Sequence, residues 1–292
     1  MTKSLSQRTK KYCSRTSVSE IWERFKQRAS DVFVCTPPKS GTTWMQTICG
    51  MLIFDNPAVN PGNGTTTRWL DSAFNDQDVL LAELEAQAHR LYIKTHTPLD
   101  GITDDENCTY LAVYRHPIDA FFSGLNHTKN MKKESTSRLL TLDVNDGFQT
   151  WLHQSHSLSE DIGNSLESLV VHYQSFPSWS SLPNIHLFHY SGMTRDLQRT
   201  VSTVSEALNC GHSDALLDAI TSAATFSKMK SDAAKYAPSA DRGIWKDNAQ
   251  FFESSTSNKW EGVLIDTSLS MYRDRMSGLL EPRDQAWLEF GS

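Results

Sequence analysis

The sequence predicts a single α/β domain with a mainly parallel central sheet flanked by helices. Three short apolar runs, 31–35, 90–95 and 109–114, each end in a polar turn, and the first and third lead directly into a helical pattern. A fourth apolar run at 184–190 ends in the same way. A helix is expected after it, from about Thr194 to Asn209, and an amphipathic helix at 76–89. Alternation of strands and helices is typical of such a sheet, here with about five strands. No long Pro/Gly/Ser linker interrupts the alternation, so we expect one domain at 30–292 after a basic N-terminal arm at 1–29.

The turn after the first apolar run has the composition of an anion-binding site. Residues 36–44 read TPPKSGTTW, and the apolar periodicity resumes at once over 45–54. Free backbone N–H groups at such a turn and helix start bind phosphate-like groups, and Lys39, Thr42 and Thr43 add a cation and hydroxyls. A Walker A loop would place its lysine after the last glycine, whereas Lys39 precedes Gly41. The turn therefore predicts an anion site of another kind.

The third apolar run predicts a second phosphate contact. It ends at Arg115, and His116 and Pro117 then begin a helix that carries Ser123 eight residues after the arginine. Proline suits the first turn of a helix. A guanidinium group matches the geometry of a phosphate dianion, so Arg115 is a candidate ligand for it.

The run at 90–95 predicts a reactive pair at its carboxyl end. Side chains repeat every two residues along a strand, so Lys94 and His96 are expected on the same side. Ligands collect at the carboxyl ends of strands in open α/β sheets. A histidine there has a pKa suited to a general base at neutral pH.

Together these segments resemble the soluble, cytosolic-type sulfotransferases that use 3′-phosphoadenosine 5′-phosphosulfate (PAPS). In their details they are more similar to the bacterial-type members of that family. The family's hallmark Pro-Lys-Ser-Gly-Thr-Thr-Trp stands at 38–44, and the string Lys-Thr-His-x-Pro-Leu-Asp-Gly at 94–101 is similar to its catalytic segment. The resemblance implies a P-loop-like domain that transfers a sulfuryl group to a hydroxyl or amine of a small molecule. His96 is then the general base, while Lys39 acts at the leaving oxygen and Lys94 at the sulfuryl oxygens.

The resemblance also implies which residues bind the nucleotide. Arg115 and Ser123 would hold its 3′-phosphate, and Phe226, in the segment ATFSKMKSD at 224–232, would lie near the adenine opposite Trp44. The family's Arg-Lys-Gly triple is not complete here, and Arg242 is its expected substitute. The implied nucleotide-binding residues are Lys39, Ser40, Gly41, Thr42, Thr43, Trp44, Arg115, Ser123, Tyr190, Thr225, Phe226, Arg242 and Gly243.

Composition excludes several classes of protein. Twenty-eight basic against thirty-four acidic residues give a net charge of −6, which argues against general nucleic-acid binding. No apolar run approaches ~18 residues, so a membrane span is not expected. The basic N-terminal residues lack an apolar region behind them, so we expect a frayed arm rather than a signal peptide. The five cysteines show no CxxC pairing, which favours a reduced, cytoplasmic protein.

Two other functions remain open from the sequence. A magnesium-dependent P-loop kinase would also bind a phosphate at such a turn, although the Walker lysine is missing. A nucleotide-binding protein without catalysis would fit if the altered segment near Arg242 abolished turnover. The favoured reaction needs no metal, because lysines alone can neutralise the charge on a sulfuryl group. The identity of the acceptor is not encoded in a recognisable motif, and a homodimer is compatible with the chain.

Overall fold

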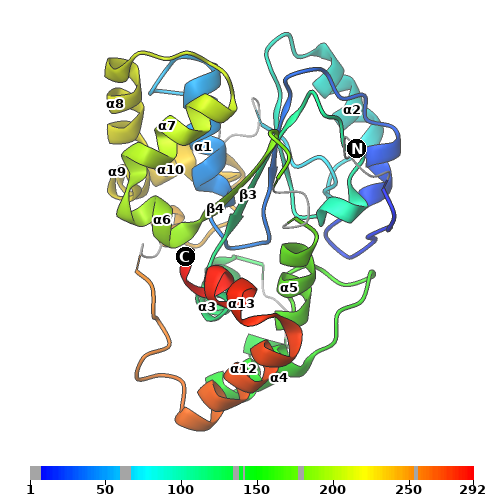
Figure 1. The fold of residues 1–292 in the computed structure, drawn as a ribbon, viewed down its shortest axis with the longest axis vertical. Coiled ribbons are helices and arrows are strands. Elements are labelled where there is room, and N and C mark those ends of the chain that lie inside the picture. Colours follow the sequence, from blue (N-terminus) through cyan, green and yellow to red (C-terminus); the bar gives the residue numbers. More distant parts are fainter. Residues whose placement is uncertain (1–7, 60–66, 134–137, 141, 177–180, 253–255) are drawn as a thin grey trace.

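The computed structural model describes residues 8–59, 67–133, 138–140, 142–176, 181–252 and 256–292. Their α/β architecture, drawn in Figure 1, is built on four strands, β1 (Val32–Cys35), β2 (Tyr92–Thr95), β3 (Thr109–Tyr114) and β4 (Ile185–His189). All neighbours are parallel, in the order β2-β1-β3-β4. The predicted fold class is confirmed, with four strands among the described residues rather than about five. Next to edge strand β2, the chain at 68–72 forms an isolated bridge between Trp69 and Lys94 rather than a strand.

The strands are buried on both faces because their apolar residues alternate between two cores. Val32 and Val34 of β1 pack into one core, whereas Phe33 and Cys35 pack into the other. The first core is covered by α1 (Thr42–Ile53), α6 (Tyr190–Arg195), α7 (Leu197–Ala207), α8 (Asp214–Ala223), α9 (Phe226–Ser231), α10 (Ala233–Tyr236) and α11 (Asn248–Phe251). Parallel strands with helices on both faces are expected to be continuously apolar, as these are.

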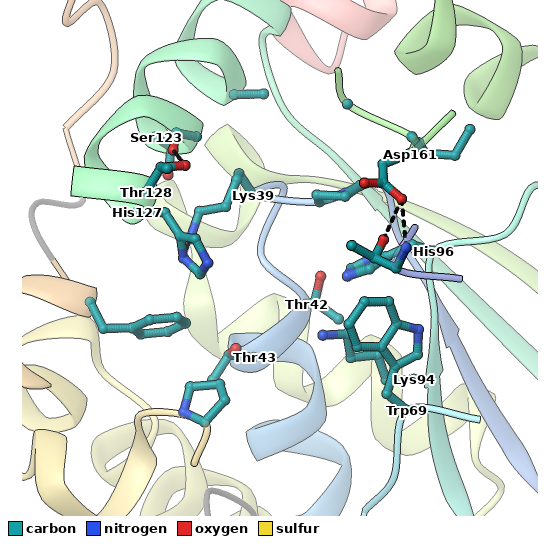
Figure 2. Close-up of a pocket in the computed structure, with 18 of the residues that line it drawn as sticks. Lys39, Thr42, Thr43, Trp69, Lys94, His96, Ser123, His127, Thr128 and Asp161 are labelled. Atoms are coloured by element: carbon teal, nitrogen blue, oxygen red, sulfur yellow. Dashed lines mark hydrogen bonds between the residues drawn. The ribbon is translucent and has the colours of Figure 1, made fainter. Parts of the chain in front are cut away.

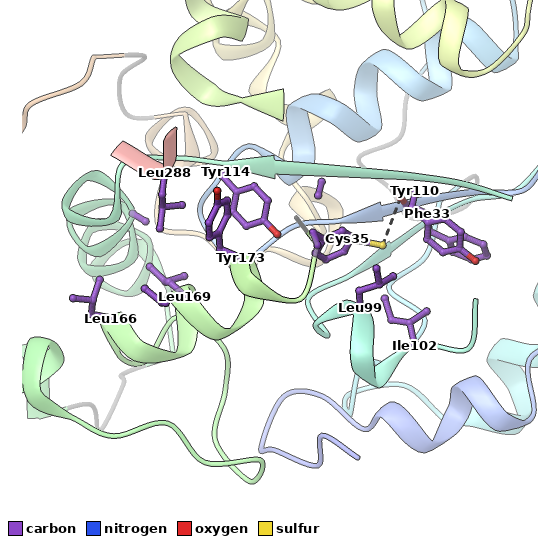
Figure 3. Packing of buried hydrophobic residues seen from close by; sticks show 14 of the residues in the cluster. Phe33, Cys35, Leu99, Ile102, Tyr110, Tyr114, Leu166, Leu169, Tyr173 and Leu288 are labelled. Carbon is purple, nitrogen blue, oxygen red and sulfur yellow. Dashed lines mark hydrogen bonds between the residues drawn. The ribbon is translucent and has the colours of Figure 1, made fainter. Parts of the chain in front are cut away.

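The second core is covered by helices that come largely from the middle and the end of the chain. They are α2 (Gln77–Ala86), α3 (Pro117–Asn130), α4 (Val144–His153), α5 (Leu166–Gln174), α12 (Asp266–Leu279) and α13 (Pro282–Phe290), with the short helices η1 (Ser19–Glu23), η2 (Leu99–Gly101) and η3 (Arg138–Leu140). A further short helix, η5 (Ala240–Arg242), follows α10 and packs against the first core through Ala240. Figure 3 shows two parts of the second core, with Tyr110 of β3 beside Phe33 and Tyr114 of β3 beside Tyr173 and Leu288.

Two expectations about helices need correction. The helix expected from about Thr194 to Asn209 is two helices, α6 and α7, because the carboxylate of Asp196 accepts a hydrogen bond from the backbone N–H of Arg199 and begins a new helix there. The amphipathic helix expected at 76–89 is α2, which Asp76 caps and which ends earlier, at Ala86.

The N-terminal residues 8–29 also differ from the expected frayed arm. Tyr12, Ile21 and Trp22 are almost completely buried, because these apolar side chains complete the core beside β1 and β2. The Tyr12 hydroxyl donates to Asp100 Oδ1 at 2.8 Å, and Lys10 forms an ion pair with the same carboxylate. This segment is therefore part of the folded domain.

Candidate active site

The carboxyl ends of all four strands open into one large cavity of about 1070 Å³. Lys39 follows β1, His96 follows β2, Arg115 follows β3 and Tyr190 follows β4, and all four residues line it. Figure 2 shows Lys39 and His127 on one side of this cavity and Lys94, His96 and Trp69 on the other. Residues from distant parts of the chain meet here because parallel strands present their carboxyl ends along one edge of the sheet.

The turn between β1 and α1 exposes backbone donors to the cavity. Lys39 and Gly41 have positive φ angles of 66° and 114°, and Gly41 is the N-cap of α1 without any side-chain cap. The first N–H groups of α1 are therefore available to an anion. A Cβ atom at Gly41 would lie 3.2 Å from Cδ2 of Tyr190, so glycine is required by both the backbone and the space.

Lys39 projects toward α3. Its Nζ lies 2.9 Å from Nδ1 of His127 and 4.8 Å from the centre of the Phe251 ring. Burial, with Lys39 and Lys94 nearby, holds the pKa of His127 well below its usual value. His127 is therefore neutral at pH 7, and its Nδ1 can accept a hydrogen bond from the Lys39 ammonium.

His96 is held in one tautomer by the chain that follows β1. Its Nδ1 lies 2.5 Å from the carbonyl oxygen of Thr36. A carbonyl oxygen only accepts, so Nδ1 carries the proton and Nε2 carries the lone pair. Burial and the neighbouring Lys94 keep the pKa of His96 well below 6.5. The side chain is thus a neutral base at physiological pH.

Lys94 lies beside His96, as the alternation of the strand predicts. Its Nζ stands 4.3 Å from the centre of the Trp69 ring, an arrangement in which the aromatic face attracts the cation. Burial lowers the pKa of Lys94 to about 8, and the charge of Asp71 opposes that change. Lys94 is thus mostly protonated at neutral pH.

Arg115 is nearly buried at the end of β3. Its guanidinium carbon lies 4.3 Å from the centre of the Tyr190 ring, and Nη2 donates to the carbonyl of Thr256 at 3.3 Å. Within the described residues its Nε has no hydrogen-bond partner, and it stands 4.0 Å from the Asp119 carboxylate. A buried guanidinium with donors to spare suits a phosphate. Ser123, on α3 and eight residues after Arg115, lines the same cavity.

Most of the other expected nucleotide-binding residues line the cavity as well. Trp44 donates from Nε1 to the carbonyl of Ala224 at 2.7 Å, just before Phe226. The expected residues found in the lining are Lys39, Gly41, Thr42, Thr43, Trp44, Arg115, Ser123, Tyr190, Phe226 and Arg242.

Three expected residues are not part of the cavity lining. Ser40 is buried under the turn, and Thr225 caps α9, where its hydroxyl accepts from the backbone N–H of Lys228. Gly243 has a φ of 62° and ends the short helix that carries Arg242. Their places suggest that they shape the backbone around the cavity.

The remaining part of the cavity is mixed in polarity. Phe121, Leu125 and Trp151 contribute apolar surface, and Phe74 at its rim is 71% exposed. Asp161 accepts from both the backbone N–H and the hydroxyl of Thr16, which joins the N-terminal segment to this side of the cavity. Phe122, the next residue along α3, lies outside the lining.

Four residues in or beside the cavity were not predicted from the sequence. They are Trp69, Asp71, His127 and Asp161. Trp69 and Asp71 belong to the string RWLD at 68–71, which stood out only as part of a loop. His127 lies one helical turn beyond Ser123, and that spacing is the signal that could have revealed it.

The described residues hold neither a metal-binding cluster nor a membrane-spanning helix. No group of three or more His, Cys, Asp or Glu side chains there is arranged to hold a metal ion. Nor does any helix in that part of the chain combine the length and the apolar character needed to cross a membrane.

Comparison with known proteins identifies the family. The family model described as "Sulfotransferase domain" matches residues 29–277, which is most of the chain. The chain belongs to the sulfotransferase family. This confirms the PAPS-dependent sulfotransferase family, and an enzyme of that type, as predicted from the motifs at 38–44 and 94–101.

Curated relatives support the same assignment. Glycolipid sulfotransferases of Mycobacterium bovis and Mycobacterium tuberculosis are each 29% identical to this sulfotransferase, over 92% of its chain and 91% of theirs. The amine sulfotransferase of Oryctolagus cuniculus is 26% identical over 73% of this chain and 67% of its own.

Solved sulfotransferase structures share the fold. The mouse sulfotransferase SULT7A1 complexed with PAP superimposes with a TM-score of 0.69 at 17% identity, covering 91% of both chains. Retinol dehydratase in complex with androsterone and inactive cofactor PAP gives a TM-score of 0.71 at 17% identity, over 89% of this chain and 83% of that one. At such identities the likeness establishes the fold.

Proposed function

We propose that this sulfotransferase transfers the sulfuryl group of PAPS to a hydroxyl (or amine) of a small-molecule acceptor, with His96 as general base. The observation that carries the proposal is the meeting of Lys39, Lys94 and His96 in one cavity, at the ends of β1 and β2. Two cations there flank a neutral imidazole whose Nε2 can accept a proton.

The reaction is an in-line displacement at sulfur. The acceptor oxygen forms a bond to sulfur while the bond from sulfur to the bridging oxygen of PAPS breaks, and 3′,5′-bisphosphoadenosine (PAP) leaves. The hydroxyl proton passes to Nε2 of His96. Lys39 neutralises charge on the departing oxygen, and Lys94 binds the sulfuryl oxygens. Positioning and electrostatic stabilisation do most of the work in such transfers.

The nucleotide is accommodated along the remaining lining. The open N–H groups of α1 and the hydroxyls of Thr42 and Thr43 suit the 5′-phosphosulfate. Arg115 and Ser123, on β3 and α3, suit the 3′-phosphate, with Arg242 as a further cation at the cavity. Trp44 and Phe226 offer aromatic surface to the adenine.

The acceptor site favours a molecule with an apolar part. Phe121, Leu125 and Trp151 line the cavity, and the exposed ring of Phe74 extends this surface at the rim. The mycobacterial relatives are named glycolipid sulfotransferases, so sugar hydroxyls of a glycolipid belong among the acceptors to be tested.

One assay tests the reaction and separates it from the alternatives. The protein is incubated with PAPS carrying radioactive sulfur and a panel of phenols, alcohols, amines and glycolipids, with and without EDTA. We expect a labelled product and an equal amount of PAP, with turnover unaffected by EDTA. ATP turnover that EDTA stops and magnesium restores would instead establish a kinase. PAP binding without any turnover across the panel would establish a non-catalytic nucleotide-binding protein.

A further inference from the structure

Asp71 is a fully buried carboxylate next to the catalytic strand. The chain at 68–72 lies along the outer edge of β2, where the N–H of Lys94 donates to the carbonyl of Arg68 at 2.8 Å and the N–H of Leu70 donates to the carbonyl of Lys94 at 3.1 Å. This pairing places Asp71 beside the residues that flank His96.

Four donors from three parts of the chain meet the Asp71 carboxylate. Trp69 Nε1 donates to Oδ1 at 2.7 Å, and Trp22 Nε1 donates to Oδ2 at 3.3 Å. The hydroxyls of Thr95 and Thr97 both donate to Oδ2 at 2.5 Å. Indole N–H groups can only donate, and one reaches each oxygen, so the arrangement fits the ionised carboxylate. Burial raises the pKa of Asp71, and these four hydrogen bonds oppose the rise, because a buried charge is tolerated only when it is satisfied in this way.

The ring of Trp69 connects these hydrogen bonds of Asp71 to both Lys94 and His96. Trp69, fixed at its N–H by Asp71, lies 4.3 Å from Nζ of Lys94 and 5.0 Å, centre to centre, from the ring of His96. Thr95 and Thr97 are the chain neighbours of His96 on either side. Asp71 thus binds the residues that lie against Lys94 and His96, although it does not line the cavity itself.

We propose that Asp71 is a positioning residue, a buried anion that holds Trp69 against Lys94 and His96 and keeps Lys94 positively charged. The inference rests on the proposed function, in which Lys94 must be a cation when PAPS binds. Burial drives the pKa of Lys94 down to about 8, and Asp71 is the charge that opposes the fall. His96, Lys39 and His127 are the other titratable groups near Lys94; both histidines have pKa values well below 6.5, so they remain neutral as Lys94 titrates.

The test is Asp71→Asn, with Asp100→Asn as its matched control. Asp100 also binds the N-terminal segment, through Tyr12 and Lys10, but has no contact with Trp69. The value of kcat/KM for PAPS is measured from pH 6 to pH 9, because this parameter reports the free enzyme. Loss of a nearby opposite charge lowers a lysine pKa by roughly one unit or more. We therefore expect Asp71→Asn to reduce kcat/KM about fivefold at pH 8 and hardly at all at pH 6.

A purely structural role for Asp71 would lower kcat/KM by the same factor at every pH, and that result would overturn the proposal. Inactivity of the wild type toward the whole acceptor panel would instead contradict the proposed function. The two failures are therefore distinguishable.

A second measurement does not depend on activity. Acetic anhydride labels only the neutral amine, so labelling of Lys94, followed by mass spectrometry, rises as pH passes through its pKa. We expect the rise at least about one pH unit lower in Asp71→Asn than in the wild type and in Asp100→Asn. Coincident curves for all three proteins would contradict the proposal.

Trp69→Phe provides a variant for the case in which Asp71→Asn does not fold. It keeps an aromatic ring over Lys94 but removes the N–H that Asp71 fixes. We expect a lower kcat for this variant. The fall of its kcat/KM at basic pH should occur at the same pH as in the wild type, because the Asp71 carboxylate remains. Trp22→Phe removes another of the donors to Asp71 at a residue outside the cavity lining, and should leave kcat close to wild type. Equal effects of the two variants would mean that the network acts only through stability.

Discussion

Nδ1 of His96 lies 2.5 Å from the carbonyl oxygen of Thr36, the residue that directly follows β1. This contact fixes the tautomer of the imidazole and joins it to the turn that carries Lys39. The imidazole of His96 and the turn that carries Lys39 are therefore joined by one hydrogen bond between the ends of two adjacent strands, β1 and β2.

The first prediction is that His96→Ala lowers kcat by ~10²–10⁴, the usual contribution of a general base, while PAP affinity changes little. Initial rates with the best acceptor and calorimetry with PAP measure the two effects. His153→Ala, an exposed histidine on α4 away from the cavity, is the matched control and should retain wild-type turnover. Near wild-type turnover by His96→Ala would remove this residue from the mechanism.

The second prediction concerns pH. As the proposed base, His96 would act when neutral, and its pKa is held well below 6.5, so activity should persist in mildly acidic buffer and fall only as pH drops through that low value. As the proposed ligand of the sulfuryl oxygens, Lys94 would act when protonated, so kcat/KM for PAPS should fall as pH rises through about 8. In Lys94→Arg the guanidinium does not titrate in this range, and the basic limb should disappear. A basic limb that persists unchanged in Lys94→Arg would assign it to another group.

The sequence predicted the parts of the site that lie at strand ends. Lys39, His96 and Arg115 each follow an apolar run and Lys94 lies near the end of one, and a parallel sheet brings such positions to one edge whatever the details of the loops. Local pattern was therefore enough to place them in one cavity. The cytoplasmic location, the homodimer and the individual roles of these residues stay predictions.

The features of the fold and the site that could not be predicted from the sequence depend on long-range packing. From the sequence, Asp71 is expected to be a polar loop residue. Only the pairing of 68–72 with β2 buries its carboxylate. The N-terminal segment was expected to be frayed because it carries many charges. Tyr12, Ile21 and Trp22 are nevertheless buried, and their burial depends on residues far along the chain. Asp196 breaks the expected long helix by a side-chain cap that competes locally with helix continuation.

The third prediction uses the contact between Lys39 and His127. Lys39→Met should reduce kcat by ~10² or more, as expected for loss of a strong donor to a developing oxyanion. His127→Leu removes the atom that accepts from Lys39 and should lower kcat about tenfold, since a hydrogen bond to a charged group contributes ~1.5–3 kcal/mol. The amide oxygen of His127→Asn can accept in place of Nδ1 and should recover most of the loss. If the leucine and asparagine variants were equally active, the contact would have no part in placing Lys39.

The fourth prediction is that Arg115 selects the 3′-phosphate. Its buried guanidinium has an Nε without a hydrogen-bond partner in the described part of the chain, and its other donors face the cavity or Thr256. Arg115→Ala should weaken binding of PAP by about 10- to 100-fold, in line with the loss of charge-assisted hydrogen bonds, but should change binding of 5′-AMP little. Calorimetry with both nucleotides measures the difference, and Arg199→Ala, on the exposed face of α7, is the control for loss of a positive charge. Equal losses for PAP and 5′-AMP would mean that Arg115 supports the fold of the cavity rather than the phosphate, because only a direct contact distinguishes the two ligands.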